Sequence, residues 1–151
     1  MSGGINIHPL ELEEIEACAD LLLRNSSETP WTSTGIFTYF LRDDTVLLAA
    51  GEDGAEPAGF AALLCAPPES DILDIAVDLP RRRQGIGGQL LDALLEAGRA
   101  RGITTFYLEV RAGNVPARSL YEKKGFEQIG YRKNYYTDPL EDAVVMRCEY
   151  A

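Results

Sequence analysis

Apolar residues along the chain form short runs, some alternating and some continuous, and longer stretches with helical spacing. The short runs are rich in Val, Ile, Leu, Phe and Tyr and are bounded by turn-forming residues, which is typical of strands. The turn-rich segment Glu52–Pro57 joins two of them and predicts a hairpin. The expected strands are Gly4–His8, Thr45–Ala50, Ala58–Cys65, Ile72–Val77, Thr104–Val110, Phe126–Tyr135 and Ala143–Tyr150.

The longer stretches carry apolar residues three or four positions apart, which predicts amphipathic helices. The clearest of them runs from Ile86 through Leu90, Leu91, Leu94 and Leu95 to a stop at Gly102. Pro9 is expected to open a first helix, which ends at Asn25–Pro30 and has the apolar stripe Leu12, Ile15, Cys18, Ala19 and Leu22. A short second helix is expected over about Ser33–Leu41. A last helix is expected over about Val115–Lys124 and is ended by Gly125.

The strand before Arg81–Gly88, the helix after it and the next strand predict a locally parallel pair in the sheet. Ligands bind such sheets at the carboxyl ends of the parallel strands. In the strand Thr104–Val110, alternation places Phe106, Leu108 and Val110 on one face and Thr105, Tyr107 and Glu109 on the other.

Length and composition place the chain among ordinary globular proteins. Its 151 residues fit one domain, 1–151, with 46% hydrophobic and 25% charged residues. No apolar run approaches the roughly 20 residues that a membrane span requires. The N-terminal segment lacks the basic start and apolar core of a signal peptide, so we expect a cytoplasmic protein that keeps this segment.

Charge and the scarcity of histidine exclude several functions. A formal net charge of -10 argues against nucleic-acid binding and favours a cationic partner. His8 is the only histidine, which excludes the usual Ser-His and Cys-His pairs and disfavours a histidine-based zinc site. Cys18, Cys65 and Cys148 lie far apart in apolar segments, so we expect buried thiols and no metal site. A general base must then be a carboxylate or another group.

The segment DLPRRRQGIGGQLL has the composition of an anion-binding turn. Gly85, Gly87 and Gly88 let the backbone close around an anion at the start of a helix, where free N–H groups face it. The arginines at 81–83 add positive charge, which suits a pyrophosphate. A surface turn with solvated arginines is the alternative that the motif alone leaves open.

Two other nucleotide-binding motifs fit this segment less well. A Walker loop requires Gly-Lys-Ser/Thr at its end, and no lysine follows these glycines. A dinucleotide-binding turn would have a glycine where Leu90 stands and would follow its strand tightly. Here seven residues separate Val77 from Gly85. We therefore disfavour a dehydrogenase.

The run from Asp74 to Gly125 resembles the GNAT superfamily of acetyltransferases. Its Arg/Gln-x-x-Gly-x-Gly/Ala signature is present as Arg82, Gly85 and Gly87, and N-x-x-A-x-x-L-Y-x-x-x-G-F begins at Asn114. The resemblance implies an α/β fold with a central, mixed and mostly antiparallel sheet. That sheet would have six to seven strands with a locally parallel central pair, flanked by about four helices.

The resemblance also implies an acetyl-CoA site. The backbone of Ile75, Ala76 and Val77 would pair with the pantetheine arm. Asn114, Ala117 and Tyr121 would lie near the pantetheine and the sulfur. The pyrophosphate would be bound by the turn Arg82, Arg83, Gln84, Gly85, Ile86, Gly87 and Gly88.

A narrower resemblance is to the ribosomal-protein alanine N-acetyltransferases. LEVRAGN, YRKNYYTDPLEDAVVM and Pro30-Trp31 are similar to elements of that subfamily. It implies a protein N-terminus as acceptor, such as that of a small-subunit ribosomal protein beginning with alanine. Trp31, Asp74, Tyr135 and Tyr136 would then contact the acceptor, and Asp74 stands where the subfamily commonly has Asn.

Acetyl transfer to an amine needs a base, because an N-terminal amine with a pKa near about 8 is mostly protonated at neutral pH. Glu109, at the carboxyl end of its strand, is the candidate base, and Tyr121 is the candidate acid for the departing thiolate. Alone, Glu109 would more often be a surface or ion-paired residue, and the resemblance favours the base. The alternatives are a lysine or small-amine acetyltransferase and a non-catalytic acyl-CoA-binding module.

Overall fold

Among the residues that the structure describes, 4–25 and 31–150 of this computed structural model, seven strands form one sheet in the order β1-β2-β3-β4-β5-β7-β6. The strands are β1 (Asn6–Pro9), β2 (Thr45–Gly51), β3 (Gly59–Ala66), β4 (Glu69–Val77), β5 (Thr105–Arg111), β6 (Glu127–Thr137) and β7 (Leu140–Glu149). The helices are α1 (Ile15–Arg24), α2 (Ser33–Phe40), α3 (Ile86–Ala100) and α4 (Val115–Lys123), with short 3-10 turns η1 (Leu12–Glu14) and η2 (Leu79–Arg81). The predicted mixed sheet with about four helices is confirmed.

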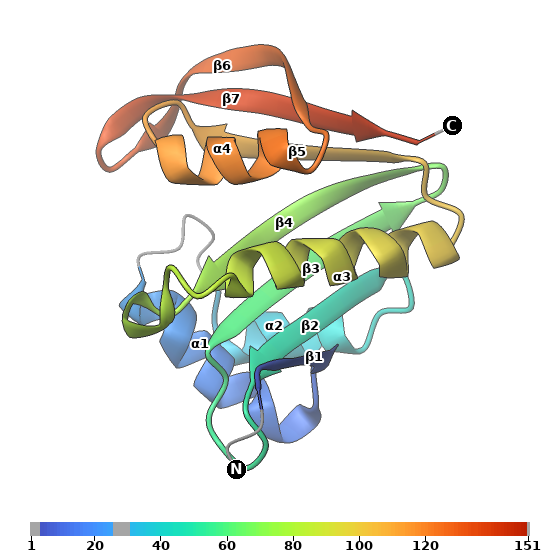
Figure 1. Ribbon diagram of the computed structural model, residues 1–151, viewed down its shortest axis with the longest axis vertical. Coiled ribbons are helices and arrows are strands. Elements are labelled where there is room, and N and C mark those ends of the chain that lie inside the picture. Colours follow the sequence, from blue (N-terminus) through green and yellow to red (C-terminus); the bar gives the residue numbers. More distant parts are fainter. Residues whose placement is uncertain (1–3, 26–30, 151) are drawn as a thin grey trace.

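The pair β4–β5 is parallel, whereas the other neighbouring strands are antiparallel. Residues Glu69–Asp71 of β4 pair with Thr105–Tyr107 of β5. Beyond this short pairing the two strands diverge toward their carboxyl ends, as Figure 1 shows. The rest of β4, including Ile75–Val77, pairs with β3 on one side and not with β5 on the other.

A β-bulge accompanies this divergence. Asp74 is opposite Ala62 and Ile72 is opposite Leu63, so Leu73 is an extra residue in β4. Such a bulge bends its strand and increases the local twist. The bend lies where β4 leaves β5, so the bulge helps to open the sheet.

Helices cover both faces of the β1–β4 part of the sheet. Helix α3 packs on one face, while α1 and α2 pack on the other (Figure 1). A Cβ at Gly98 would lie 2.7 Å from the Phe106 ring, so glycine lets α3 approach β5 closely. The predicted faces of β5 are confirmed, because Phe106, Leu108 and Val110 are buried. The three cysteines are buried, as expected, and are free thiols.

The prediction for the start of the first helix was wrong. Pro9 ends β1, and the chain enters η1 before α1 begins at Ile15. The Glu11 backbone N–H donates to the Glu14 carboxylate over 3.0 Å, which stabilises this tight turn. Leu12 is therefore 55% exposed, and Leu21 is the buried residue that the predicted stripe omitted.

Two strands begin earlier than predicted, β4 and β7, the latter at Leu140 instead of Ala143. Strand β4 begins at Glu69, three residues before the prediction, because residues 69–71 pair with β5 and the Ser70 hydroxyl donates to the Thr105 carbonyl. Helix α1 ends at Arg24, and residues 26–30 of its predicted terminator lie outside the described residues. Within the described ranges, the helices are too short or too polar to cross a membrane.

Candidate active site

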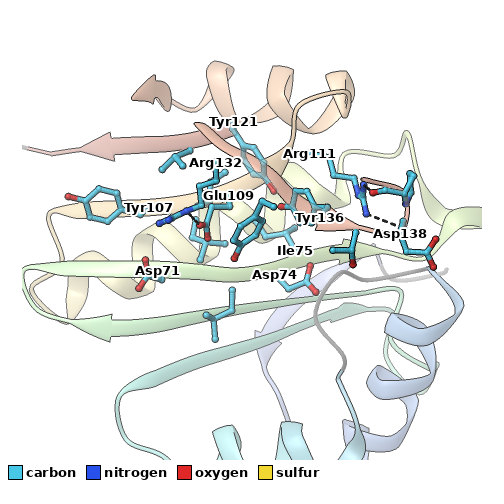
Figure 2. A pocket seen from close by; sticks show the side chains of 17 residues that line it. Asp71, Asp74, Ile75, Tyr107, Glu109, Arg111, Tyr121, Arg132, Tyr136 and Asp138 are labelled. Atoms are coloured by element: carbon cyan, nitrogen blue, oxygen red, sulfur yellow. Dashed lines mark hydrogen bonds and ion pairs between the residues drawn. The ribbon is translucent and has the colours of Figure 1, made fainter. Parts of the chain in front are cut away.

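A pocket of about 1260 Å³ lies where β4 and β5 diverge. Its walls come from four separate parts of the chain: β4, β5, α4 and the β6–β7 hairpin (Figure 2). Six of the predicted site residues line it: Asp74, Ile75, Glu109, Tyr121, Tyr135 and Tyr136.

Glu109 is on the solvent-facing side of β5, as alternation predicted, and is paired with a residue that the sequence did not single out. Its Oε2 lies 2.5 Å from Nε of Arg132 on β6. The side chains of Arg132 and Glu109 are 58% and 32% exposed. The predicted base is thus accessible from the pocket and held by a cation.

Tyr121 projects from α4 into the same pocket, as Figure 2 shows. Its ring packs at 5.8 Å from Phe126, which fixes the side chain against the core. Burial raises the pKa of Tyr121 well above its usual value, and nearby Asp74 and Tyr136 raise it further. The phenol therefore stays protonated at neutral pH and can donate a proton or a hydrogen bond.

Asp74 and Trp31 are brought together, although 43 positions separate them in the sequence. The Trp31 indole N–H donates to Asp74 Oδ2 over 2.9 Å. Trp31 is buried, with ring centroids 5.4 Å from Phe60 and 5.5 Å from Tyr39. The indole orients the Asp74 carboxylate at the pocket wall, while Pro30 lies outside the described residues.

The predicted acceptor tyrosines lie where β6 is irregular. The register between β6 and β7 shifts between Arg132 and Tyr136, and Asn134 has a positive φ of 53°. The Asn134 N–H donates to Asp142 over 2.8 Å. Tyr136 is buried, whereas Tyr135 is 49% exposed. The irregularity turns both rings toward the pocket.

Arg111 holds the β6–β7 turn against the end of β5. Its guanidinium donates to the carbonyls of Pro139 and Asp138 and to the Glu141 carboxylate, at 2.8, 3.2 and 3.1 Å. The guanidinium carbon also lies 4.5 Å from the Tyr136 ring centroid. Arg111 thus fixes this wall of the pocket.

The predicted pyrophosphate turn lies beyond the end of β4, outside the residues that line the pocket. Gly85 is the N-cap of α3 with φ 81°, a left-handed conformation that favours glycine, and no side chain caps this helix end. The first backbone N–H groups of a helix lack intrahelical partners. Such N–H groups can bind an anion, so pyrophosphate binding by this turn stays a prediction.

The arginines of the turn have different surroundings. Arg81 pairs with Glu52 at 3.0 Å, while Arg82 donates to the Val77 carbonyl at 3.0 Å. Arg83 is exposed and has a positive φ of 66°. Arg82 therefore stabilises the turn itself, in addition to the charge it brings.

Asn25, which caps the C-terminus of α1, connects that helix to the turn. Its side chain donates to Asp78 at 2.9 Å and accepts from the Leu79 N–H at 3.0 Å and from Arg82 at 3.3 Å. The hydrogen bonds from Asn25 and Arg24 lower the pKa of Asp78 below its usual value. A residue far away in the sequence thus fixes the position of the turn.

Asn114 and Ala117 start α4 and do not line the pocket. The Asn114 side chain accepts a hydrogen bond from the Ala117 N–H at 3.3 Å, so it is the N-cap of the helix that carries Tyr121. Its observed contact stabilises the helix. A contact with pantetheine stays a prediction for both residues.

Sequence analysis missed several residues of the pocket, among them Asp71, Tyr107, Arg111 and Arg132. Tyr107 shares the face of Glu109 on β5, which was a usable signal. Asp71 pairs with Tyr107 across the parallel strands; desolvation raises its pKa, and Glu109 and Glu69 add to the shift. Nothing in the local sequence indicated that Arg132 meets Glu109.

Among residues 4–25 and 31–150, no group of three or more His, Cys, Asp and Glu could hold a metal ion.

Comparison with known proteins agrees with this geometry. Residues 12–126 match the model of the acetyltransferase (GNAT) family. The chain is 44% identical over 91 residues to the ribosomal protein bS18-alanine N-acetyltransferase of Escherichia coli (strain K12), a match that covers 59% of this chain and 62% of that protein. A Bacillus subtilis (strain 168) protein, named provisionally for the same activity, is 30% identical over 140 residues, which cover 93% of this chain and 92% of that protein.

Among solved structures, the ribosomal-protein-S18-alanine N-acetyltransferase from Escherichia coli superimposes with a TM-score of 0.85 at 33% sequence identity. The superposition covers 97% of this chain and 94% of that chain. The likeness in structure therefore extends over nearly the whole chain.

Proposed function

The chain belongs to the acetyltransferase (GNAT) family, and from this premise we propose that it transfers an acetyl group from acetyl-CoA to the α-amino group of a protein N-terminus. The observation that carries the proposal is the meeting of Glu109 and Tyr121 in one pocket, beside the part of β4 that β5 leaves unpaired. A protonated amine needs a base and a departing thiolate needs an acid, and both must be within reach of the same reacting group.

The residues present suit acetyl-CoA as co-substrate. The N-terminus of α3 and the cationic turn Arg82–Gly88 would bind its pyrophosphate. The backbone of Ile75–Val77, which has β3 on one side and no strand partner among the described residues of β5 on the other, would pair with the pantetheine arm. This would direct the thioester along β4 into the pocket.

Glu109 would accept the proton of the acceptor ammonium, directly or through water. The freed amine attacks the thioester carbonyl carbon, the new C–N bond forms, and the C–S bond breaks. Tyr121 protonates the departing sulfur, and the nitrogen loses its second proton to solvent. Glu109 then releases the first proton to solvent, and the Tyr121 phenolate takes up a proton from solvent, which restores both groups. The raised pKa of Tyr121 means that the phenol is in the required protonated form at neutral pH.

For the acceptor, we infer an N-terminal alanine of a small-subunit ribosomal protein. The relatives from Escherichia coli and Bacillus subtilis are named for alanine acetylation of ribosomal protein bS18. The net charge of -10 suits a basic acceptor protein. Asp74, Trp31, Tyr135 and Tyr136 would contact the first residues of the acceptor.

The test compares three acceptors with acetyl-CoA: a peptide that begins with alanine, its N-terminally blocked form containing lysine, and a polyamine. We expect acetylation of the first and little of the others, because a lysine amine with a reference pKa of about 10.4 is harder to deprotonate. Preferred acetylation of the blocked peptide or the polyamine would instead support a lysine or small-amine acetyltransferase. Tight binding of acetyl-CoA without transfer to any amine would indicate a non-catalytic module.

A further inference from the structure

In the ion pair between Glu109 and Arg132, the guanidinium lies at the carboxylate that the acceptor ammonium would approach in the proposed function. Arg132 Nε lies 2.5 Å from Glu109 Oε2, and both side chains line the pocket. An acceptor α-amino group is also a cation at neutral pH, and the same carboxylate attracts it and accepts its proton. Arg132 and the acceptor ammonium therefore compete for Glu109.

The exposure of the pair makes such an exchange feasible. With 58% of Arg132 and 32% of Glu109 exposed, solvent screens their attraction. Pairs of this kind change an equilibrium by roughly two- to fivefold. An incoming ammonium replaces the lost charge and hydrogen bonds, so the exchange leaves no unpaired carboxylate.

The position of Arg132 in the sheet also favours its release. Strand β6 is at the edge of the sheet, and its register with β7 shifts directly after Arg132. The guanidinium carbon lies 5.8 Å from the Tyr135 ring centroid, so a second favourable partner for the cation is close by. The side chain can leave Glu109 without disturbing a regular strand pairing.

Arg111, the other arginine in the pocket wall, shows the contrasting arrangement. Its side chain is only 15% exposed, and it donates to two backbone carbonyls as well as to Glu141. Removal of this guanidinium would break three hydrogen bonds at once. Of these two arginines, Arg132 is therefore the one suited to exchange.

We propose that Arg132 is a positioning residue that holds Glu109 before the acceptor binds and is displaced by the ammonium of the acceptor. Acetylation converts this ammonium into a neutral amide, which carries no charge to replace the guanidinium. Arg132 then pairs with Glu109 again, and the neutral product gains no attraction from the carboxylate. The identity of the acceptor rests on the proposed function, whereas the competition rests on the pair itself.

The test measures dissociation constants for a synthetic peptide that begins with alanine and for the same peptide with an acetylated N-terminus. In Arg132→Gln, we expect the ammonium peptide to bind roughly threefold more tightly, because its competitor is gone. The acetylated peptide should bind as it does to the wild type. Weaker binding of the ammonium peptide, or an equal change for both peptides, would overturn the competition.

Two further variants separate this role from a general effect of charge. Lys133→Gln removes the same charge from the adjacent exposed residue, which does not line the pocket, so we expect neither constant to change. Arg132→Lys keeps a competing cation and should restore the wild-type constants. A threefold change in Lys133→Gln would show that net charge, and not the pair, controls binding.

The same peptides distinguish this inference from the proposed function. If the wild type bound both peptides but did not acetylate the free N-terminus of the alanine peptide, the proposed function would fail. The ratio of the two dissociation constants in wild type and Arg132→Gln would still decide the role of Arg132. If acetylation proceeded and the ratio were unchanged, the inference about Arg132 alone would fail.

Discussion

The turn Arg82–Gly88 and the pocket between β4 and β5 lie along the same strand, yet they are built in opposite ways. The turn is a continuous segment that offers backbone N–H groups at the uncapped start of α3. The pocket collects side chains from β4, β5, α4 and the β6–β7 hairpin. Anion binding can thus be encoded locally, whereas an acid and a base must be brought together by the fold.

This difference predicts two separable kinds of variant. Changes in the turn should weaken binding of acetyl-CoA and leave the chemical step largely intact. Changes in the pocket should impair turnover or acceptor binding and leave acetyl-CoA binding intact. The four variants below test this separation, from the largest expected effect to the smallest.

The largest effect is expected for Glu109→Gln. The amide keeps the shape of the side chain but cannot accept the proton, so kcat should fall roughly a thousandfold. The dissociation constant of acetyl-CoA, measured by calorimetry, should stay the same. Glu122→Gln, on the exposed side of α4, is the matched control and should have wild-type turnover. Unchanged turnover of Glu109→Gln across pH would refute its role as base.

Tyr121→Phe should lower kcat roughly a hundredfold, because the ring keeps its packing against Phe126 while the thiolate loses its proton donor. Steady-state kinetics at saturating acetyl-CoA measure this effect, and a thermal melt checks that the packing is retained. A variant that melts normally and turns over at the wild-type rate would show that the phenol serves only for packing.

Gly85→Ala tests the turn. A side chain at φ 81° is strained by about 1–2 kcal/mol, which should weaken binding of acetyl-CoA roughly fivefold with kcat little changed. Gly54, with φ 77° in the β2–β3 connection, provides a matched control. Gly54→Ala should lose similar stability but bind acetyl-CoA normally. Equal losses of affinity in both variants would mean that general stability, not the turn, controls binding.

Asp74→Asn is the mildest change, since the amide oxygen can still accept the Trp31 hydrogen bond. Loss of one negative charge at the acceptor wall should raise the acceptor KM roughly threefold. The KM of acetyl-CoA should not change. Asp43→Asn, an exposed carboxylate between α2 and β2, controls for net charge. A shift in the KM of acetyl-CoA would show that Asp74 affects acetyl-CoA binding and not only acceptor binding.

Much of the fold was predictable because its signals are local. The period of apolar residues identified seven strands and four helices close to their observed bounds, and alternation put Glu109 on the correct face of β5. The first helix shows where this fails. Its start depends on a hydrogen bond between Glu11 and Glu14 in a tight turn, which the apolar pattern does not contain.

For the site, the sequence alone determined the conformation of the turn, because Gly85 and the start of α3 are adjacent in the chain and their backbone geometry is local. It also supplied Glu109 and Tyr121 as the candidate base and acid. Only the tertiary structure decided that Asn25 fixes the turn, that Trp31 orients Asp74 and that Arg132 pairs with Glu109. These contacts join residues 23 to 53 positions apart, and only the packing of the elements specifies them.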